Sequence, residues 1–111
     1  MKIALSSSGK SINSNLGETF GRCPYFLIVE IENKEIKKME VVENIIRNQT
    51  GGVGVSVAQM IVEKGVDVLI TKNVGPRALD VLEQFKVDIF NGSGSAEENI
   101  QKFIEGKLKK L

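Results

Sequence analysis

Cys23 is the one side chain that could act as a soft metal ligand or a sulfur nucleophile, because the 111 residues contain a single cysteine. It lies in the segment Gly21-Arg22-Cys23-Pro24, where the neighbouring Arg22 favours the thiolate form. One thiolate cannot complete a closed zinc or cluster site, which normally takes four protein ligands. Cys23 could therefore anchor a preassembled cluster, pair with its counterpart in a dimer, or be a small buried hydrophobic residue.

Histidine is absent from the chain, which removes the commonest metal ligand and general base. Catalytic triads built on histidine, H-E-x-x-H zinc sites and Cys/His zinc fingers all lack their parts. The single cysteine also excludes an internal disulfide. These absences exclude several enzyme chemistries at once.

Two glycine-containing loops offer further candidate binding residues. The first holds three glycines just before a segment with helical periodicity, and the second places a glycine, a proline suited to the first helical position, and an arginine in succession. Such glycines allow close backbone approach to a ligand, or they are no more than flexible helix starts. The candidates are Gly51, Gly52, Gly54, Gly75 and Arg77.

Three other motif matches fail on inspection. Residues 4–11 (ALSSSGKS) fit a relaxed phosphate-loop pattern, but residues 12–17 lack the helical period and helix formers that must follow. The glycines at 92 and 94 suggest a dinucleotide fingerprint, yet the third glycine position holds Glu97. A two-metal nuclease needs a carboxylate on the first strand, where residues 2–5 offer none.

The overall composition indicates a globular protein, with 41% hydrophobic residues, 26% charged residues and a net charge of +1. We expect one domain over residues 1–111. The near-neutral charge predicts no nucleic-acid partner. No apolar run approaches the roughly 20 residues of a membrane helix, so we expect no membrane association and a cytoplasmic location.

The hydrophobic pattern predicts an α/β fold. We expect strands at 2–6, 25–31, 35–43, 66–70 and 86–90, and helices near 53–64, 76–85 and 96–108. In the last helix, Ser95 and Glu98 fit a capping box. Residues 7–23 show no period and exceed the length at which a structureless loop usually means function or mobility. We therefore expect this loop to be mobile.

Connection rules limit how these elements are arranged. A hairpin makes the second and third strands antiparallel, and helical crossovers demand parallel, right-handed connections. The resulting five-stranded mixed sheet has order 3-2-1-4-5 with only strand 2 antiparallel, a ribonuclease H-like three-layer layout. The polar loops and helix N-termini then share one edge, which predicts an anionic ligand between the first and fourth strands.

Several short motifs occur in one order along the chain: FGRCPYF at 20–26, VVEN at 41–44, GGVG at 51–54, GVDVLI at 65–70 and GPRA at 75–78. With them the chain, from residue 1 to about residue 108, resembles the dinitrogenase iron-molybdenum cofactor biosynthesis family of NifX-like small domains. The resemblance implies the ribonuclease H-like fold and a non-catalytic protein that binds or carries an iron-sulfur or iron-molybdenum type cluster, or assists its assembly. A cluster-assembly or acceptor protein is the implied partner.

Many relatives carry a histidine just before the FGRC motif and another just before the glycine run. Here these places hold Thr19 and residues 48–50 (NQT), so both candidate imidazole ligands are absent. Two hypotheses follow. In the first, Cys23 is the thiolate ligand of a cluster, Arg22 and Arg77 are its cationic partners, and the glycine loops close over it. In the second, the chain binds a small anion or a partner protein and has lost the metal site.

Overall fold

The computed structural model describes all 111 residues, which form one mixed sheet of six strands and three helices. The strands are β1 (Lys2–Ser7), β2 (Tyr25–Glu32), β3 (Glu35–Glu43), β4 (Val68–Thr71), β5 (Asp88–Asn91) and β6 (Lys109–Lys110). The helices are α1 (Val53–Glu63), α2 (Pro76–Gln84) and α3 (Ala96–Ile104). None of these helices combines the length and the apolar character needed to span a membrane.

The sheet has the order β3-β2-β1-β4-β5-β6. Strands β1, β4 and β5 run parallel, whereas β2 is antiparallel to both β1 and β3. The predicted order of the first five strands and the reversed β2 are therefore confirmed. The topology rules sufficed for this part because a tight hairpin and two helical crossovers, through α1 and α2, leave few alternatives.

The prediction of five strands is wrong, because β6 pairs antiparallel with β5. The last helix stops at Ile104 instead of continuing to 108, since Gly106 adopts φ 72° and the Lys107 amide donates to the Lys102 carbonyl at 2.8 Å. This is a Schellman-type C-cap. The chain beyond it lies along the free edge of β5, where the Leu111 amide donates to the Ile89 carbonyl.

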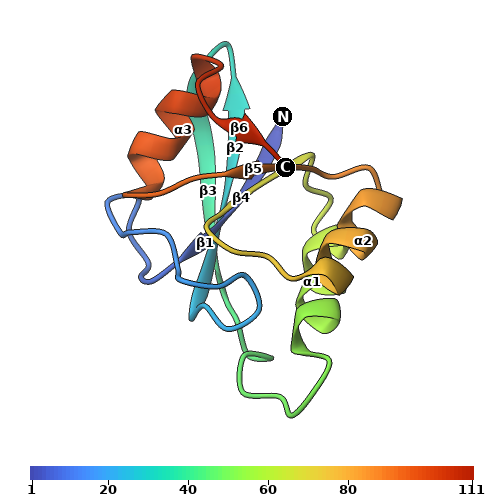
Figure 1. Ribbon diagram of the computed structural model, residues 1–111. Coiled ribbons are helices and arrows are strands. Elements are labelled where there is room, and N and C mark those ends of the chain that lie inside the picture. Colours follow the sequence, from blue (N-terminus) through green and yellow to red (C-terminus); the bar gives the residue numbers. More distant parts are fainter.

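Two hydrophobic clusters lie on opposite faces of the sheet. One packs against α1 and α2 and the other against α3, so the molecule has three layers (Figure 1). Alternation along β2 divides its side chains between them: Phe26 and Ile28 belong to the first cluster, Leu27 and Val29 to the second. The predicted three-layer arrangement follows from these central strands being buried on both faces.

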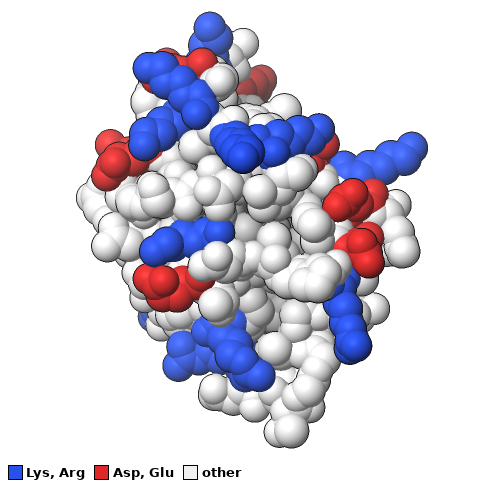
Figure 2. All heavy atoms as spheres, in the orientation of Figure 1, with Lys and Arg blue, Asp and Glu red and all other residues white.

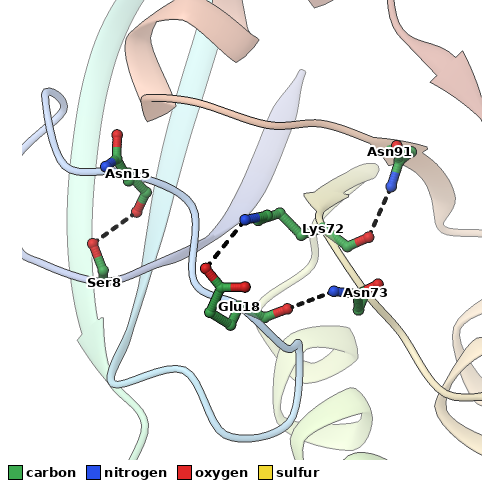
Figure 3. Close-up of polar contacts among 6 residues, drawn as sticks. All are labelled: Ser8, Asn15, Glu18, Lys72, Asn73 and Asn91. Carbon is green, nitrogen blue, oxygen red and sulfur yellow. Dashed lines mark hydrogen bonds and ion pairs between the residues drawn. The ribbon is translucent and has the colours of Figure 1, made fainter.

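The loop between β1 and β2 has a defined path. The Gly17 amide donates to the Ser6 carbonyl at 3.1 Å and the Leu16 amide to the Gly94 carbonyl at 2.9 Å, while the Leu16 and Phe20 side chains are buried. Figure 3 shows the polar contacts that hold the loop to itself and to the segment after β4. These contacts argue against the mobility predicted for this loop. No helix starts at residues 9–11, as expected from the failed phosphate-loop match.

Candidate functional site

A pocket of about 580 Å³ opens where α1 and α2 begin. Three segments line it: residues 19–21 from the end of the β1–β2 loop, residues 52–55 at the start of α1, and residues 73–78 leading into α2. In Figure 2 the middle of this face is largely free of charged side chains, and lysines and arginines lie towards its margins. The pocket is therefore a mostly uncharged hollow formed by backbone-rich loop ends.

Small residues allow these three segments to meet. A Cβ atom on Gly21 would lie 3.4 Å from the Cα atom of Gly54, and a Cβ atom on Gly54 would lie 3.5 Å from the Cβ atom of Ala78. These are ordinary van der Waals distances, so a methyl group would fit, whereas side chains longer than that of alanine would push the loop and the two helices apart. Gly54 thus serves close packing between α1 and α2, and Gly52 supplies the left-handed φ of 64° from which α1 starts.

Five backbone amides at this pocket have no acceptor within the protein. The first amides that donate within the two helices are those of Ser56, to Gly52, and Leu79, to Gly75. Neither Gly52 nor Gly75 can provide a side-chain cap, and Pro76 has no amide hydrogen. The amides left free, all from pocket-lining residues, are those of Val53, Gly54, Val55, Arg77 and Ala78.

Helix α3 shows the opposite arrangement at its N-terminus. The Ser95 hydroxyl accepts from the Glu98 amide at 3.1 Å, and two acidic residues occupy the first turn. The predicted cap is present, although the Glu98 carboxylate accepts from the Ser95 hydroxyl rather than from its amide. Helices α1 and α2 have no acidic residue in the first turn. The two helices at the pocket therefore keep their positive ends free, which favours an anionic ligand.

Arg77 is the one charged residue that lines this pocket. The other cations nearby have protein partners: Lys72 forms an ion pair with Glu18 at 3.1 Å (Figure 3), and Arg22 donates from Nη1 to the Arg47 carbonyl at 2.7 Å. The structure does not bring Arg22 to the pocket, contrary to its predicted role beside Arg77. Its guanidinium instead stabilises the loop that precedes α1.

Cys23 lies in the hydrophobic core and is 2% exposed. Its Sγ atom is 3.4 Å from the Phe20 carbonyl oxygen and 3.3 Å from that of Tyr25, and it does not line the pocket. Burial raises the pKa of the thiol from 9.0 to about 11, against smaller opposing contributions from hydrogen bonds and Arg47. The structure therefore argues against the predicted thiolate, because desolvation outweighs the nearby positive charge.

We expect the raised pKa of Cys23 to make the folded protein less stable in alkali. Well below pH 9 the thiol is mostly neutral in both states, whereas between the unfolded value of 9.0 and the folded value of about 11 the unfolded chain has released more protons than the folded one. Stability is then lost as pH rises, by about 2 kcal/mol at about pH 10.5. Urea unfolding of wild type and Cys23→Ala at both ends of this range isolates the effect from lysine and tyrosine titration. Parallel pH profiles would refute the raised pKa.

The structure sorts the predicted site residues into two groups. Gly52, Gly54, Gly75 and Arg77 line the pocket, as expected from their place before α1 and α2. The other three do not, and they are Gly51, Arg22 and Cys23. Gly51 has φ 73° with open space around its Cβ position, so it serves the turn rather than a close approach.

The pocket also lies away from its predicted position between β1 and β4. Ser6 and Thr71 share a buried hydroxyl contact of 2.9 Å between these strands, and the Phe20 amide donates to the Asn73 carbonyl at 2.8 Å. The β1–β2 loop thereby closes the expected crevice. The pocket opens instead beside α1 and α2, and residues 19–21 and 73–74 were missed as lining because no sequence pattern marks that loop's path.

No group of three or more His, Cys, Asp or Glu side chains lies close enough together to hold a metal ion. The pocket offers backbone N–H donors, one guanidinium and apolar side chains. Such donors bind the outer anionic atoms of a ligand. A metal cluster bound here would accordingly be held through its surface atoms.

The chain was compared with protein families and with known proteins, and both comparisons found matches over nearly its whole length. The profile of the family described as "Dinitrogenase iron-molybdenum cofactor" matches residues 1–106. An uncharacterised protein of Methanocaldococcus jannaschii is 45% identical over 112 residues, a match that covers 100% of this chain and 92% of that protein.

Solved structures agree with this grouping. A Thermotoga protein of the DUF35 family, determined by NMR, has 37% identity and a TM-score of 0.83, with 99% of this chain and 92% of that one covered. The apo form of the orange protein from Desulfovibrio gigas superimposes with a TM-score of 0.91 over 99% of this chain and 92% of that one. At 24% identity, this second likeness shows the fold alone.

Proposed function

Since the chain belongs to the dinitrogenase iron-molybdenum cofactor family, we propose that it binds an anionic iron-sulfur or iron-molybdenum type cluster as cargo. The observation that carries the proposal is the pocket at which two uncapped helix N-termini converge with Arg77. The family supports a role in the biosynthesis or binding of this cofactor. The chain acts as a carrier or assembly assistant, not as a catalyst.

The free amides and Arg77 would hold the sulfur or other anionic surface atoms of the cluster. Five N–H donors on two helices can surround a ligand much larger than a single small anion, which matches the 580 Å³ pocket. Apolar side chains of Phe20, Val53 and Val74 line the same hollow and strengthen these contacts by excluding water. A ligand held without covalent bonds can be passed on to an acceptor protein.

A small-anion binding module remains the second candidate. The same uncapped amides favour it, since they would also accept phosphate or sulfate. The size and the apolar share of the pocket favour the cluster, because a small, strongly hydrated anion would leave most of the hollow unfilled. We also propose that the fold is related to that of ribonuclease H.

Replacing Arg77 with glutamine is expected to weaken cluster binding at least tenfold, because it removes the charged donor that lines the pocket. A charge-assisted hydrogen bond contributes about 1.5 to 3 kcal/mol. The measurement is an anaerobic titration with a preassembled iron-molybdenum or iron-sulfur cluster, followed by desalting and determination of visible absorbance and metal content. Arg22→Gln is the matched control, since it removes the same charge outside the pocket.

Two results would overturn the cluster proposal. One is failure of wild type to retain any cluster or bound metal after desalting. The other is an equal loss of binding in Arg77→Gln and Arg22→Gln, which would mean that only the general charge of this end of the protein matters. Saturable binding of phosphate or sulfate, with no cluster retained, would establish the small-anion module instead.

A further inference from the structure

The two edges of the sheet differ greatly in length and protection. At one edge β6 has only two residues, and so short an edge strand offers little to a further strand. At the other edge β3 has nine residues, eight of them exposed and one half-buried. Its Ile36, Met39 and Val41 side chains are 42%, 40% and 39% exposed. Strand β3 is therefore a long, accessible edge with an apolar stripe.

The register with β2 assigns the side chains of β3 to faces. Met39 lies opposite Val29, and Val41 lies opposite Leu27. These two β2 residues belong to the cluster on the α3 side of the sheet, so Met39 and Val41 lie on that side. Lys38 and Glu40 lie on the opposite side, where they share a surface depression with Ile28.

The backbone groups of β3 alternate in the same way. The Asn44 amide donates to the Pro24 carbonyl at 2.9 Å, so even-numbered residues at this end of β3 direct their amides towards β2. The amides and carbonyls of Met39, Val41 and Glu43 consequently point away from the sheet. They are available to a further antiparallel strand.

We propose that a second copy of this chain occupies this edge, with the two β3 strands antiparallel about a two-fold axis at Met39. In this register Met39 faces Met39 of the second copy. Lys38 of each copy faces Glu40 of the other, which gives two symmetry-related opposite-charge pairs. The result is a continuous twelve-stranded sheet across two molecules, since each contributes six strands.

Charge selects this register over its neighbours. Side chains directly opposite each other lie on the same face, so the register can shift only in steps that keep faces matched. One such shift sets Lys38 against Lys38, and the shift in the other direction sets Glu40 against Glu40. Both oppose like charges, which is destabilising. Lys64, 3.1 Å from Glu40 in the isolated chain, leaves the second carboxylate oxygen of Glu40 free for Lys38.

The bulge between Glu30 and Ile31 limits the extent of the pairing. It changes the register of β3 near Lys37. With the two-fold axis at Met39, Val41 faces Lys37 of the second copy, so regular pairing is expected over residues 38–40 only. Contact over so short a segment predicts a dimer that dissociates on dilution rather than an obligate one.

The test is sedimentation equilibrium over a range of protein concentrations at low salt. Wild type is expected to move from the 12.2 kDa monomer towards twice that mass. Lys38→Glu and Glu40→Lys should each raise the dissociation constant roughly tenfold, because each sets two like-charge pairs against each other. The double variant should regain dimerisation, and an equimolar mixture of the two single variants should form a heterodimer. Ile45→Lys, at an 82% exposed site outside β3, is the control.

Circular dichroism checks that each variant is folded, and the rescue by mixing makes the test independent of any single variant's stability. Wild type that stays monomeric at about millimolar concentration, a range in which even weak complexes form, would overturn the proposal. A dimer that responds equally to Ile45→Lys, or that shows no rescue on mixing, would do the same. None of these outcomes bears on the cluster pocket. The pocket lies at the N-terminal ends of α1 and α2, whereas Lys64, which contacts Glu40 of β3, follows the C-terminal end of α1.

Discussion

Cys23 is expected to react with iodoacetamide at least a hundredfold more slowly in the folded protein than in the chain unfolded by guanidinium. The thiolate is the reactive form, and burial raises the pKa of Cys23 from 9.0 to about 11. Near pH 8 this difference of two units lowers the thiolate fraction roughly a hundredfold. Limited access adds to the effect, because the side chain is 2% exposed. Mass spectrometry of protein quenched at successive times gives both rates.

This measurement also distinguishes two roles of Cys23, packing in the core and ligation of a cluster. A thiol that is neutral, buried and outside the pocket lining packs the core, and the cluster should bind equally well to wild type and Cys23→Ala. If native Cys23 is alkylated as fast as the unfolded chain, the thiol is accessible and its predicted role as a cluster ligand regains support. A Cys23→Ala variant that remains folded but takes up no cluster would point the same way.

Replacing Gly17 with alanine should destabilise the protein by about 3 kcal/mol. A Cβ atom on Gly17 would lie within 2.4 Å of the Cβ atom of Cys23 and 3.6 Å from the Ser7 carbonyl carbon. The contact cannot be relieved by a flexible side chain, because Cβ moves only with the backbone. Gly17 also donates to the Ser6 carbonyl, so displacement would disturb the loop that closes the sheet edge. Urea unfolding followed by circular dichroism gives the free energy.

Gly75→Ala is the matched control for this change. Gly75 has φ −73° and nothing within 4 Å of its Cβ position, so alanine should alter stability by no more than about 0.5 kcal/mol. In a Cys23→Gly background the clashing Cβ atom is gone, and Gly17→Ala should then cost much less. Equal costs in the two backgrounds would show that the Gly17–Cys23 contact is not the cause.

The motifs that this chain shares with its family have two different structural roles. The family motif around Cys23 builds the core beneath the loop, and the glycine motifs before α1 and α2 line the hollow. Asn44 connects the two regions, since its side-chain amide donates to the Gly21 and Cys23 carbonyls at 3.0 and 2.9 Å. The FGRC segment therefore shapes the pocket by holding Gly21 in place, even though its cysteine faces inward.

The sequence by itself was enough to predict the α/β class, the order of the first five strands, the reversed β2 and the starts of all three helices. Each of these features depends on residues that are close together in the sequence. The spacing of apolar side chains indicates the strands and helices, Pro76 marks the start of α2, and the Ser95 cap marks the start of α3. Gly52, Gly54, Gly75 and Arg77 were predicted for the same reason, because their site is the start of a helix.

Only the tertiary structure decided the state of Cys23, the position of the pocket and the sixth strand. The pKa of Cys23 is raised because distant segments bury the thiol, including Gly17, the end of β1 and Asn44, and desolvation depends on all of them together. The pocket is not at its predicted position because the β1–β2 loop binds Asn73, some fifty residues away, and closes the crevice between β1 and β4. Contacts between residues far apart in the chain leave no period or spacing in the sequence, since their geometry exists only after the sheet has formed.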